Sequence, residues 1–422
     1  MRAGVHVVLR ASAPLFLLLG ACDGADRAHG TDGAATPAVA VIDSAGVRMV
    51  TITGAPDELP VWRLAPEPLH VVTGASTGDS AAFSFVGPVR WLADGGLVVA
   101  DHDAAQLFLF DATGGFTRTL GRRGAGPGEL RSIATLTVQS GDTITTWDRS
   151  QRRLSYWHPV AGYTRQLVFN ESEDGDLFTL DVWPWQDSLV VVLQQFILPP
   201  PPLSASQPAV KWPAPVALAL RDRSGRTLGE TPRFAGSFSV LDPKGDGPAP
   251  FANLPFVAIG PRAIWFGSGE DFTLQRLAPD FTLASRVRWP SQGEPLTPEE
   301  VARVRDTTIA RLAQRIPVER ARAALANSFL PEMLPAQRPA TGRVFVDEAD
   351  RLWVARYEAR VIASPVQPTP TRWTVLASDG TPLAALELPP GTRLEDVRAQ
   401  RAVVVQRDSL DVEHVAVFEI LR

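Results

Sequence analysis

The sequence predicts an all-β chain built as a six-bladed β-propeller, in which four-stranded sheets are arranged around a central axis. Three observations lead to this prediction. The chain matches itself at an offset of 47 residues, and short strand patterns separated by turns recur along most of its length. In addition, 45% of the 422 residues are hydrophobic and 21% are charged, which is the composition of a folded protein with a large core.

The N-terminus carries a predicted export signal. Two arginines precede an apolar stretch at 11–21 that is too short to span a bilayer. The residues Leu-Gly-Ala-Cys at 19–22, at the end of this stretch, resemble a bacterial lipobox. Cys22 is the sole cysteine of the chain. The resemblance implies a lipoprotein signal peptide at 1–21 and a lipid on Cys22. An ordinary signal peptide with an incidental cysteine is the alternative.

The residues after the signal peptide predict a tether and then the folded part. Residues 22–46 are small and polar and show no periodicity, so we expect a flexible tether there and the propeller at 47–422. The chain is therefore expected to be a membrane-anchored lipoprotein of the bacterial cell envelope that faces the periplasm or the cell surface. Its net charge of −5 argues against a nucleic-acid partner.

The repeat defines the blades. The offset of 47 residues places Asp101 on Asp148 and Leu107 on Leu154. The first unit predicts strands at 89–92, 97–100, 107–110 and 116–120, and weaker copies of its second strand occur at 189–192, 264–266, 352–355 and 403–405. Together with the second unit, these copies predict six blades.

The last blade is predicted to borrow a strand from the N-terminus. It contains strand patterns near Val397, at 403–405 and at 415–421, and then the chain stops. Residues 69–72 precede a Gly-rich stretch, just as the outer strand of the first blade does. An N-terminal strand in the last blade would close the ring and remove two exposed sheet edges.

Residues 95–101, 106–111 and 121–130 carry a resemblance to a known group. They resemble the six-bladed propellers of the NHL-repeat and TolB-like kind, over roughly 86–170. This resemblance implies the fold. Members of the group bind proteins, RNA or small ligands, and some are enzymes, so the resemblance does not name a function.

The long connections are predicted to share one face. Strand direction alternates within a blade, so connections between second and third strands, and those between blades, emerge at one end. The long segments at 195–215, 291–341 and 357–371 are all of these two kinds. The segment at about 297–330 is expected to be helical, because Thr297 and Pro298 form a helix-start signal. It is either a lid over the channel or an insertion packed on the rim.

Charged residues of the first two blades mark the candidate binding face. Six arginines and two aspartates belong to its loops: Arg122, Arg123, Arg131, Arg149, Arg152, Arg153, Asp101 and Asp148. Arginine suits carboxylate and phosphate groups, which indicates an anionic small-molecule partner. The alternative is a solvated rim of arginines paired with nearby acids. The two aspartates are interpreted mainly as turn residues that accept backbone N–H bonds.

No catalytic residue, metal or cofactor is predicted. The histidines are scattered, and the chain has neither a Gly-x-Ser-x-Gly elbow nor a phosphate loop. The favoured hypothesis is a propeller that binds an unidentified ligand or protein through its long-loop face. A propeller hydrolase or lactonase with a metal in the central channel is the alternative, and an envelope sensor or assembly scaffold is a third possibility.

Overall fold

The computed structural model describes residues 37–72, 83, 85–169, 176–186, 188–204, 207–290, 293–359, 369–408 and 412–422. The described residues all belong to one compact unit, Ala35–Arg422. The predicted signal peptide, the lipidation residue Cys22 and the tether up to residue 36 lie outside the described residues. Within the described part of the chain, no helix is long and apolar enough to cross a membrane.

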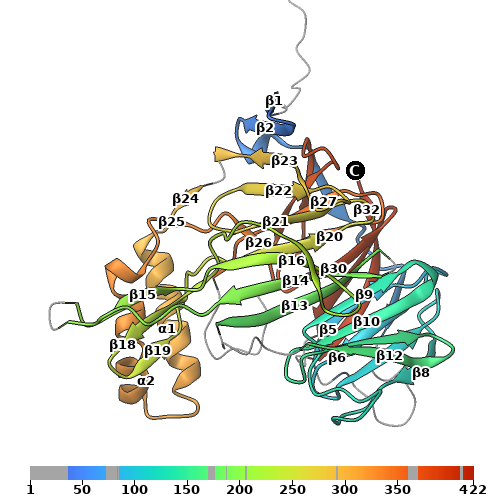
Figure 1. The fold of residues 1–422 in the computed structure, drawn as a ribbon, viewed down its shortest axis with the longest axis horizontal. Helices are drawn as coiled ribbons and strands as arrows, with labels where there is room; N and C mark the ends of the chain where they lie inside the picture. The colour runs from blue at the N-terminus through green and yellow to red at the C-terminus, as the bar shows by residue number, and fades with distance from the viewer. Residues whose placement is uncertain are drawn as a thin grey trace, which may run out of the picture. The chain divides into compact units, whose positions relative to one another are not determined.

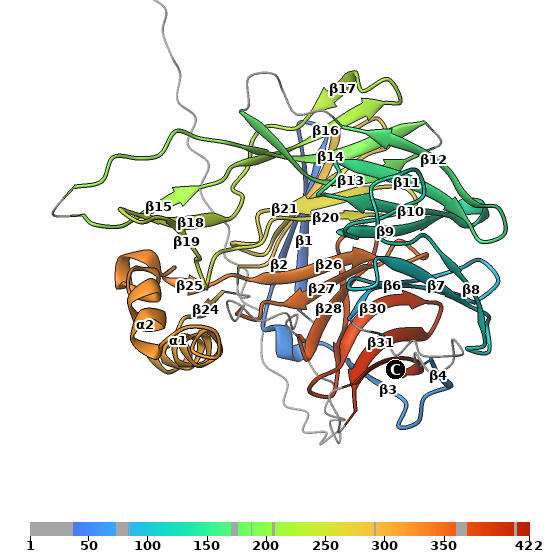
Figure 2. The same cartoon turned by 90° about the horizontal axis from the view of Figure 1, so that it is seen from below.

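The described strands form six blades of four strands each, and added N-terminal strands extend blade four and join blades five and six into larger sheets (Figures 1 and 2). Blade one contains β5 (Val86–Trp91), β6 (Leu97–Asp101), β7 (Gln106–Phe110) and β8 (Phe116–Leu120). Blade two contains β9 (Thr135–Gln139), β10 (Thr143–Asp148), β11 (Arg153–His158) and β12 (Gly162–Val168). Neighbouring strands are antiparallel, and the first two blades agree closely with the predicted repeat.

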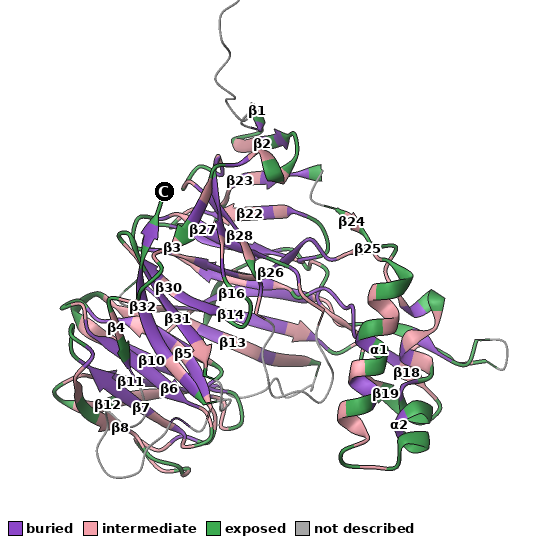
Figure 3. Cartoon of the chain, turned by 180° about the vertical axis from the view of Figure 1, so that it is seen from behind, coloured by how far each residue is buried: buried purple, intermediate pink, exposed green. Residues whose placement is uncertain are grey.

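The middle blades follow the same plan. Blade three contains β13 (Leu177–Trp185), β14 (Leu189–Phe196), β16 (Val216–Asp222) and β17 (Thr227–Glu230). Blade four contains β20 (Phe256–Ile259), β21 (Ile264–Gly267), β22 (Thr273–Leu277) and β23 (Leu283–Arg288). The second strands of the blades, such as β6, β10 and β21, are almost wholly buried, because each lies between neighbouring blades, whereas outer strands such as β8 and β17 are largely accessible (Figure 3).

The last two blades complete the set. Blade five contains β26 (Thr341–Val346), β27 (Leu352–Arg356), β28 (Arg372–Leu376) and β29 (Pro382–Glu387). Blade six contains β30 (Arg393–Arg398), β31 (Arg401–Arg407) and β32 (Glu413–Leu421). Its fourth strand is β4 (His70–Val72), which pairs with β32. The predicted closure by an N-terminal strand is therefore confirmed.

Another N-terminal strand joins the last two blades. Strand β3 (Val61–Leu64) runs parallel to β29 of blade five and also pairs with the end of β32. The strand before β4 thus holds blade six to blade five, and β4 itself completes blade six. The sequence analysis did not anticipate this strand, because four residues carry too short a pattern to reveal a parallel partner more than 300 positions away.

The tether boundary requires a correction. Residues 22–46 were predicted as tether, yet β1 (Ala38–Ser44) forms a hairpin with β2 (Val47–Thr53), and β2 runs parallel to β23 at the outer edge of blade four. Ala45 and Gly46 make the turn with φ of 51° and 79°. The hairpin is ordered because Val50 and Ile52 of β2 are buried in the core between blades four and five.

The predicted helical segment is confirmed as two helices, α1 (Pro298–Leu312) and α2 (Val318–Leu325). The Thr297 hydroxyl accepts a hydrogen bond from the Glu300 amide at 3.2 Å, as a helix N-cap does. Short 3-10 turns are η1 (Pro56–Glu58), η3 (Ser140–Asp142), η5 (Asn327–Phe329) and η6 (Pro331–Met333).

The helices pack with strands from other blades into one body, here called the composite insertion. Its strands are β15 (Val210–Pro213), β18 (Phe238–Asp242), β19 (Gly245–Gly247), β24 (Glu294–Pro295) and β25 (Gln337–Arg338). The Asn327 side chain donates to Asp242 at 2.7 Å, and Lys211 Nζ donates to the Leu334 carbonyl at 3.1 Å. Long connections of blades three, four and five therefore meet on one side (Figures 1 and 2).

Candidate functional site: the loop-face hollow and the channel cluster

A hollow opens among the loops of blades one, two and three. Its volume is about 720 Å³, and its lining residues come from the ends of second strands, the links between blades and the start of β13. They are His102, Ser132, Ile133, Ala134, Arg149, Ser150, Arg152 and Phe178. We call it the loop-face hollow, because every loop that lines it belongs to the connections predicted to share one face.

Asp148 fixes one wall of the loop-face hollow. Its carboxylate accepts hydrogen bonds from the Arg131 amide at 2.7 Å and from the Ser132 amide and hydroxyl at 3.2 and 2.8 Å. It also accepts from the Ser150 hydroxyl at 2.7 Å and from the Gln151 amide and side chain at 3.1 and 2.7 Å. Asp148 therefore joins the link between blades one and two to the β10–β11 loop.

These contacts decide the ionisation of Asp148. Burial alone raises its pKa, but the hydrogen bonds from Arg131, Ser150, Gln151 and Ser132 bring the pKa below its ordinary value. Asp101, the equivalent residue of blade one, is also buried, and its Oδ1 accepts from the Ala104 amide at 2.8 Å. Both aspartates shape the loops that follow their strands.

Of the six predicted arginines, Arg149 and Arg152 line the loop-face hollow. Arg149 Nε donates to the Leu180 carbonyl at 2.9 Å, and its Nη2 lies 3.2 Å from the Asp181 carboxylate. Burial raises the pKa of Asp181 despite the attraction of Arg149. Arg152 has a left-handed backbone with φ of 49°, a strained conformation of the kind that concentrates at binding sites.

Two further arginines hold the rim near the first link between blades. Arg122 forms an ion pair with Glu129 at 2.7 Å and keeps a largely exposed side chain. Arg123 donates to the backbone carbonyl of Asp103. Neither is among the residues that line the hollow.

Arg153 and Arg131 contribute to the scaffold. Arg153 is buried and donates to the carbonyls of Ala125 and Gly126, both at 3.0 Å, so it supports the Gly-rich loop from beneath. Arg131 reaches Asp148 through its backbone amide. The structure thus divides the predicted arginines between the hollow, the rim and the loop scaffold.

His102 is a lining residue that the sequence did not single out for binding. Its ring stacks on Phe85, with centroids 5.4 Å apart, and lies close above Gly87. Burial and, next, the positive charge of Arg393 lower the pKa of His102, so its imidazole is neutral at neutral pH. Its position directly after β6 was visible in the sequence, but a single histidine in a loop carries no spacing signal.

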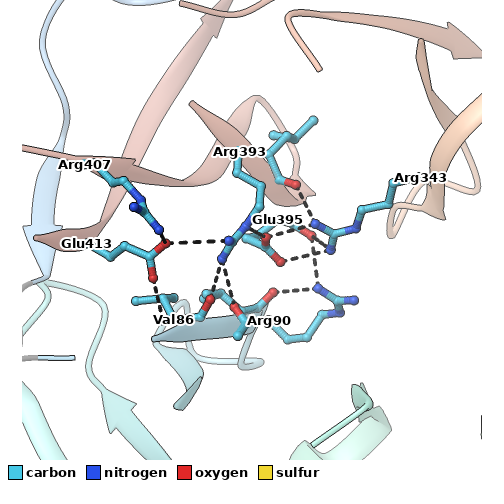
Figure 4. Close-up of polar contacts among 10 residues, drawn as sticks. Val86, Arg90, Arg343, Arg393, Glu395, Arg407 and Glu413 are labelled. Atoms are coloured by element: carbon cyan, nitrogen blue, oxygen red, sulfur yellow. Dashed lines mark hydrogen bonds and ion pairs between the residues drawn. The ribbon is translucent and has the colours of Figure 1, made fainter. Parts of the chain in front are cut away.

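A group of charged residues lies on blades one, five and six, most of them on the innermost strands β5, β26 and β30 (Figure 4). We call it the channel cluster. Its members labelled in Figure 4 are Arg90 of β5, Arg343 of β26, Arg393 and Glu395 of β30, Arg407 of β31 and Glu413 of β32. Asp396, which follows Glu395 on β30, is the seventh member.

Glu395 is the centre of the channel cluster. Arg343 Nη1 and Nη2 donate to its two carboxylate oxygens, both at 2.9 Å, and Arg393 Nε donates to Oε1 at 2.6 Å. Burial alone raises the pKa of Glu395, yet Arg343 and Arg393 outweigh burial and lower it to about 2. Glu395 is therefore ionised across the physiological range.

The cluster also connects the last blade to the first. Arg393 Nη2 donates to the Val86 carbonyl at 2.6 Å, and the Val86 amide donates to Glu413 at 2.6 Å. Glu413 forms an ion pair with Arg407 at 3.1 Å. The cluster was not predicted from the sequence, although Arg90 and Arg343 are each the single charged residue of an innermost strand, which is the available signal.

No group of three or more His, Cys, Asp or Glu side chains that could hold a metal ion occurs in the described ranges.

Comparisons with known proteins bear on the fold. The family model DUF5128, described as a 6-bladed beta-propeller, matches residues 76–164. Together with the arrangement of the strands, this match defines the class: the chain is a six-bladed β-propeller. No curated protein matches the chain.

Several solved structures are similar at low identity. A member of the DUF4221 family from Bacteroides vulgatus is 11% identical with a TM-score of 0.48, and the match covers 86% of this chain and 99% of that one. A gluconolactonase from Xanthomonas campestris is 12% identical with a TM-score of 0.40, covering 85% and 98%. A calcium-binding protein, regucalcin, from Agrobacterium tumefaciens is 11% identical with a TM-score of 0.39, covering 86% and 96%. These likenesses carry no argument about function.

Proposed function

We propose that this protein is an exported, lipid-anchored propeller of the NHL-repeat and TolB-like kind that binds a ligand through its loop-bearing face. The loop-face hollow is the proposed site. The observation that carries this proposal is its construction: three blades contribute to the lining, and the buried Asp148 holds two of the lining loops together. Preformed concave sites with a few fixed polar groups are typical of ligand pockets.

The lining favours a ligand with an anionic group and an apolar part. Arg149 lines the hollow and is held in place by Asp181 and the Leu180 carbonyl, so its guanidinium is the group that would meet the acid group of a ligand. Ala134 and Phe178 supply apolar surface on the same hollow, and the fully buried Ile133 supports it from below. A protein partner would bind by placing in the hollow an exposed side chain or chain end that has an acid group and an apolar part.

Blocking the hollow tests the proposal. Ala134 is exposed and lines the hollow, so Ala134→Trp fills it without disturbing the core. Ala161→Trp is the matched control, because it adds the same ring to an exposed turn of the same blade at the opposite end of the strands. A library of small carboxylates and organophosphates is screened against both variants and the unmodified chain by native mass spectrometry.

The proposal expects at least one compound that binds the unmodified chain and Ala161→Trp, and that loses at least tenfold in affinity for Ala134→Trp. Binding that is equal in all three proteins would place the ligand elsewhere and overturn the assignment of the site.

The anchoring part of the proposal is tested separately. Cys22→Ala removes the residue that receives the lipid in the lipobox resemblance. The variant is expected in the soluble fraction of a bacterial envelope preparation, whereas the unmodified chain sediments with membranes. A variant that still sediments with membranes after a salt wash would show that the anchor is not on Cys22.

A further inference from the structure

Arg90 differs from the other arginines of the channel cluster. Its Nη1 donates to two carbonyl oxygens, that of Val89 at 2.8 Å and that of Glu395 at 3.0 Å (Figure 4). Across the described residues, no carboxylate lies within ion-pair distance of its guanidinium. Arg343, Arg393 and Arg407, in contrast, each form an ion pair.

The nearest carboxylates are already occupied. Both oxygens of Glu395 accept from Arg343, and one of them also accepts from Arg393. Asp396 accepts from the Trp91 amide at 3.3 Å and from the Val397 amide at 2.8 Å. Arginine side chains thus hold the Glu395 carboxylate, and backbone amides hold that of Asp396.

The charges of the cluster do not balance. Arg407 and Glu413 neutralise each other, which leaves the three cations Arg90, Arg343 and Arg393 against the two acids Glu395 and Asp396. Among the described members of the cluster, one positive charge is in excess even when both acids are ionised. A charge enclosed by protein is costly unless an opposite charge accompanies it, and carbonyl dipoles compensate it only in part.

The excess charge is accessible. Arg90 lies on β5, the innermost strand of blade one, and keeps part of its surface exposed. Arg343 on the innermost strand of blade five is also partly exposed, with 33% of its side chain accessible. Within the described residues, hydrogen bonds are found only at Nη1 of Arg90, so Nε and Nη2 are the nitrogens that an ion would meet.

We propose that the central channel binds a small monovalent anion, a halide or the carboxylate of a small acid, against the guanidinium of Arg90. The ion supplies the one negative charge that the channel cluster lacks. This inference goes beyond the proposed function, because it requires neither the loop-face hollow nor its ligand.

The site is expected to respond to pH. Four titratable groups lie near Arg90 or its neighbour Arg393: Asp396 and Glu395 of β30, Glu413 of β32, and His102. The positive charges around them are those of Arg90, Arg343, Arg393 and Arg407. Burial raises the pKa of Asp396 to about 6 against the attraction of Arg90. Protonation of Asp396 adds a second excess positive charge, and protonation of His102 acts in the same direction, so the anion binds more tightly at pH 5 than at pH 8.

A salt exchange experiment tests the site. The full chain and Arg90→Gln are unfolded by heat at constant ionic strength while bromide replaces fluoride, and in a second series acetate replaces fluoride. Arg63→Gln is the control, because Arg63 is an exposed arginine paired with Glu387 at the outer seam. We expect a saturable rise in Tm of several degrees for the unmodified chain and Arg63→Gln, larger at pH 5, and no saturable rise for Arg90→Gln.

The two series identify the source of the charge. A rise with bromide supports a free inorganic ion, and a rise with acetate alone supports the carboxylate of a small acid. Parallel curves for the unmodified chain and Arg90→Gln in both series overturn the proposal. Crystals of the unmodified chain grown in bromide decide the matter if Arg90→Gln does not fold, because the proposal requires an anomalous peak beside Arg90 and fails without one.

Discussion

Arg343 of blade five and Glu395 of blade six form a two-pronged ion pair, with both N–O distances 2.9 Å. Glu395 is also held by Arg393 of its own strand, and Arg393 in turn donates to the Val86 carbonyl of blade one. Three blades thus meet at one carboxylate. Removal of one partner from such a buried pair leaves an uncompensated charge, so the cluster acts as a unit in stabilising the ring.

The first prediction concerns Asp396, whose pKa burial raises to about 6 from an ordinary 3.8. The folded chain then holds a proton that the unfolded chain releases, so the contribution of Asp396 to stability is full below about pH 4 and is lost as pH rises through 6. Asp396→Asn has no carboxyl group to ionise, so the variant does not lose this stability as the pH rises. Because one pKa unit corresponds to about 1.4 kcal/mol, we expect the variant to gain about 1–3 kcal/mol over the unmodified chain at pH 8.

Urea unfolding at pH 5 and pH 8 measures this effect. The gain from Asp396→Asn is expected to shrink at pH 5, while Asp57→Asn, a change at an exposed residue, stays neutral at both. Glu395 does not interfere, because its pKa of about 2 confines its titration to more acidic solutions. A gain that is the same at both pH values would contradict the assigned pKa.

The second prediction concerns Asp148, the acceptor that joins Ser132 to Ser150 in the wall of the loop-face hollow. Asp148→Asn keeps the shape of the side chain but removes its negative charge. One carboxylate oxygen, an acceptor, becomes an amide NH₂ group that faces hydrogen-bond donors of the neighbouring loops. Hydrogen bonds to charged groups contribute about 1.5–3 kcal/mol each and are coupled here, so we expect a loss of about 2–4 kcal/mol in the free energy of unfolding.

Chemical denaturation at pH 7 measures the loss. Asp111→Asn is the control, because Asp111 makes similar turn contacts to Thr113 and Gly115 on an exposed turn, where a small effect is expected. The pKa of Asp148 is lowered, so its contribution is present at neutral pH and is lost as the solution is acidified through that lowered pKa. Equal losses for Asp148→Asn and Asp111→Asn would show that the buried hydrogen bonds of Asp148 contribute no more to stability than those of an exposed turn.

The parts of the fold that could be predicted from the sequence depend on residues close to one another along the chain. The apolar runs of β6 and β7 and the turn residues around them indicate a blade, and the Thr297 cap indicates α1. The closing strand β4 was predictable because the last blade visibly lacked a member.

The parts that escaped prediction depend on neighbours distant in sequence. The β18–β19 hairpin is held by β15 and by Asn327, which no pattern within 238–247 announces. The channel cluster brings Arg90 beside Glu395, 305 positions away, and the isolated charges gain meaning only when the strands are placed in space. The hollow likewise arises from loops whose shape is set by Asp148.

The third prediction concerns the attachment of the composite insertion. The buried Tyr357 hydroxyl lies 3.3 Å from the carbonyls of Pro250 and Ala252, so it joins the start of the loop after β27 to the link before β20. Tyr357→Phe leaves these carbonyls without that donor and is expected to cost about 1 kcal/mol.

Limited proteolysis with mass spectrometry checks the location of the effect. Cleavage of Tyr357→Phe is expected to accelerate near 250–255, while Tyr163→Phe, which removes a hydroxyl contact to Gln166 on β12, leaves that region unchanged. Faster cleavage in both variants would indicate general loosening instead of a local attachment.

The last prediction tests ring closure at two adjacent residues of β4. Val72 is fully buried in the core between blades six and one, whereas Val71 is 42% exposed on the same strand. Val72→Ala removes two buried methyl groups and leaves a cavity, for which we expect about 1–2.5 kcal/mol of lost stability. Val71→Ala is the matched control and is expected to cost less than about 0.5 kcal/mol.

Thermal unfolding distinguishes a local from a global role for this strand. If β4 closes the ring, Val72→Ala lowers the Tm of a single transition, because blade six contacts blades one and five and unfolds with them. A separate early transition in Val72→Ala, with the main transition unmoved, would mean that the blades remain together without the closing strand. The removal of residues 69–72 carries the same expectation with a larger effect, because it also exposes the outer edge of β32.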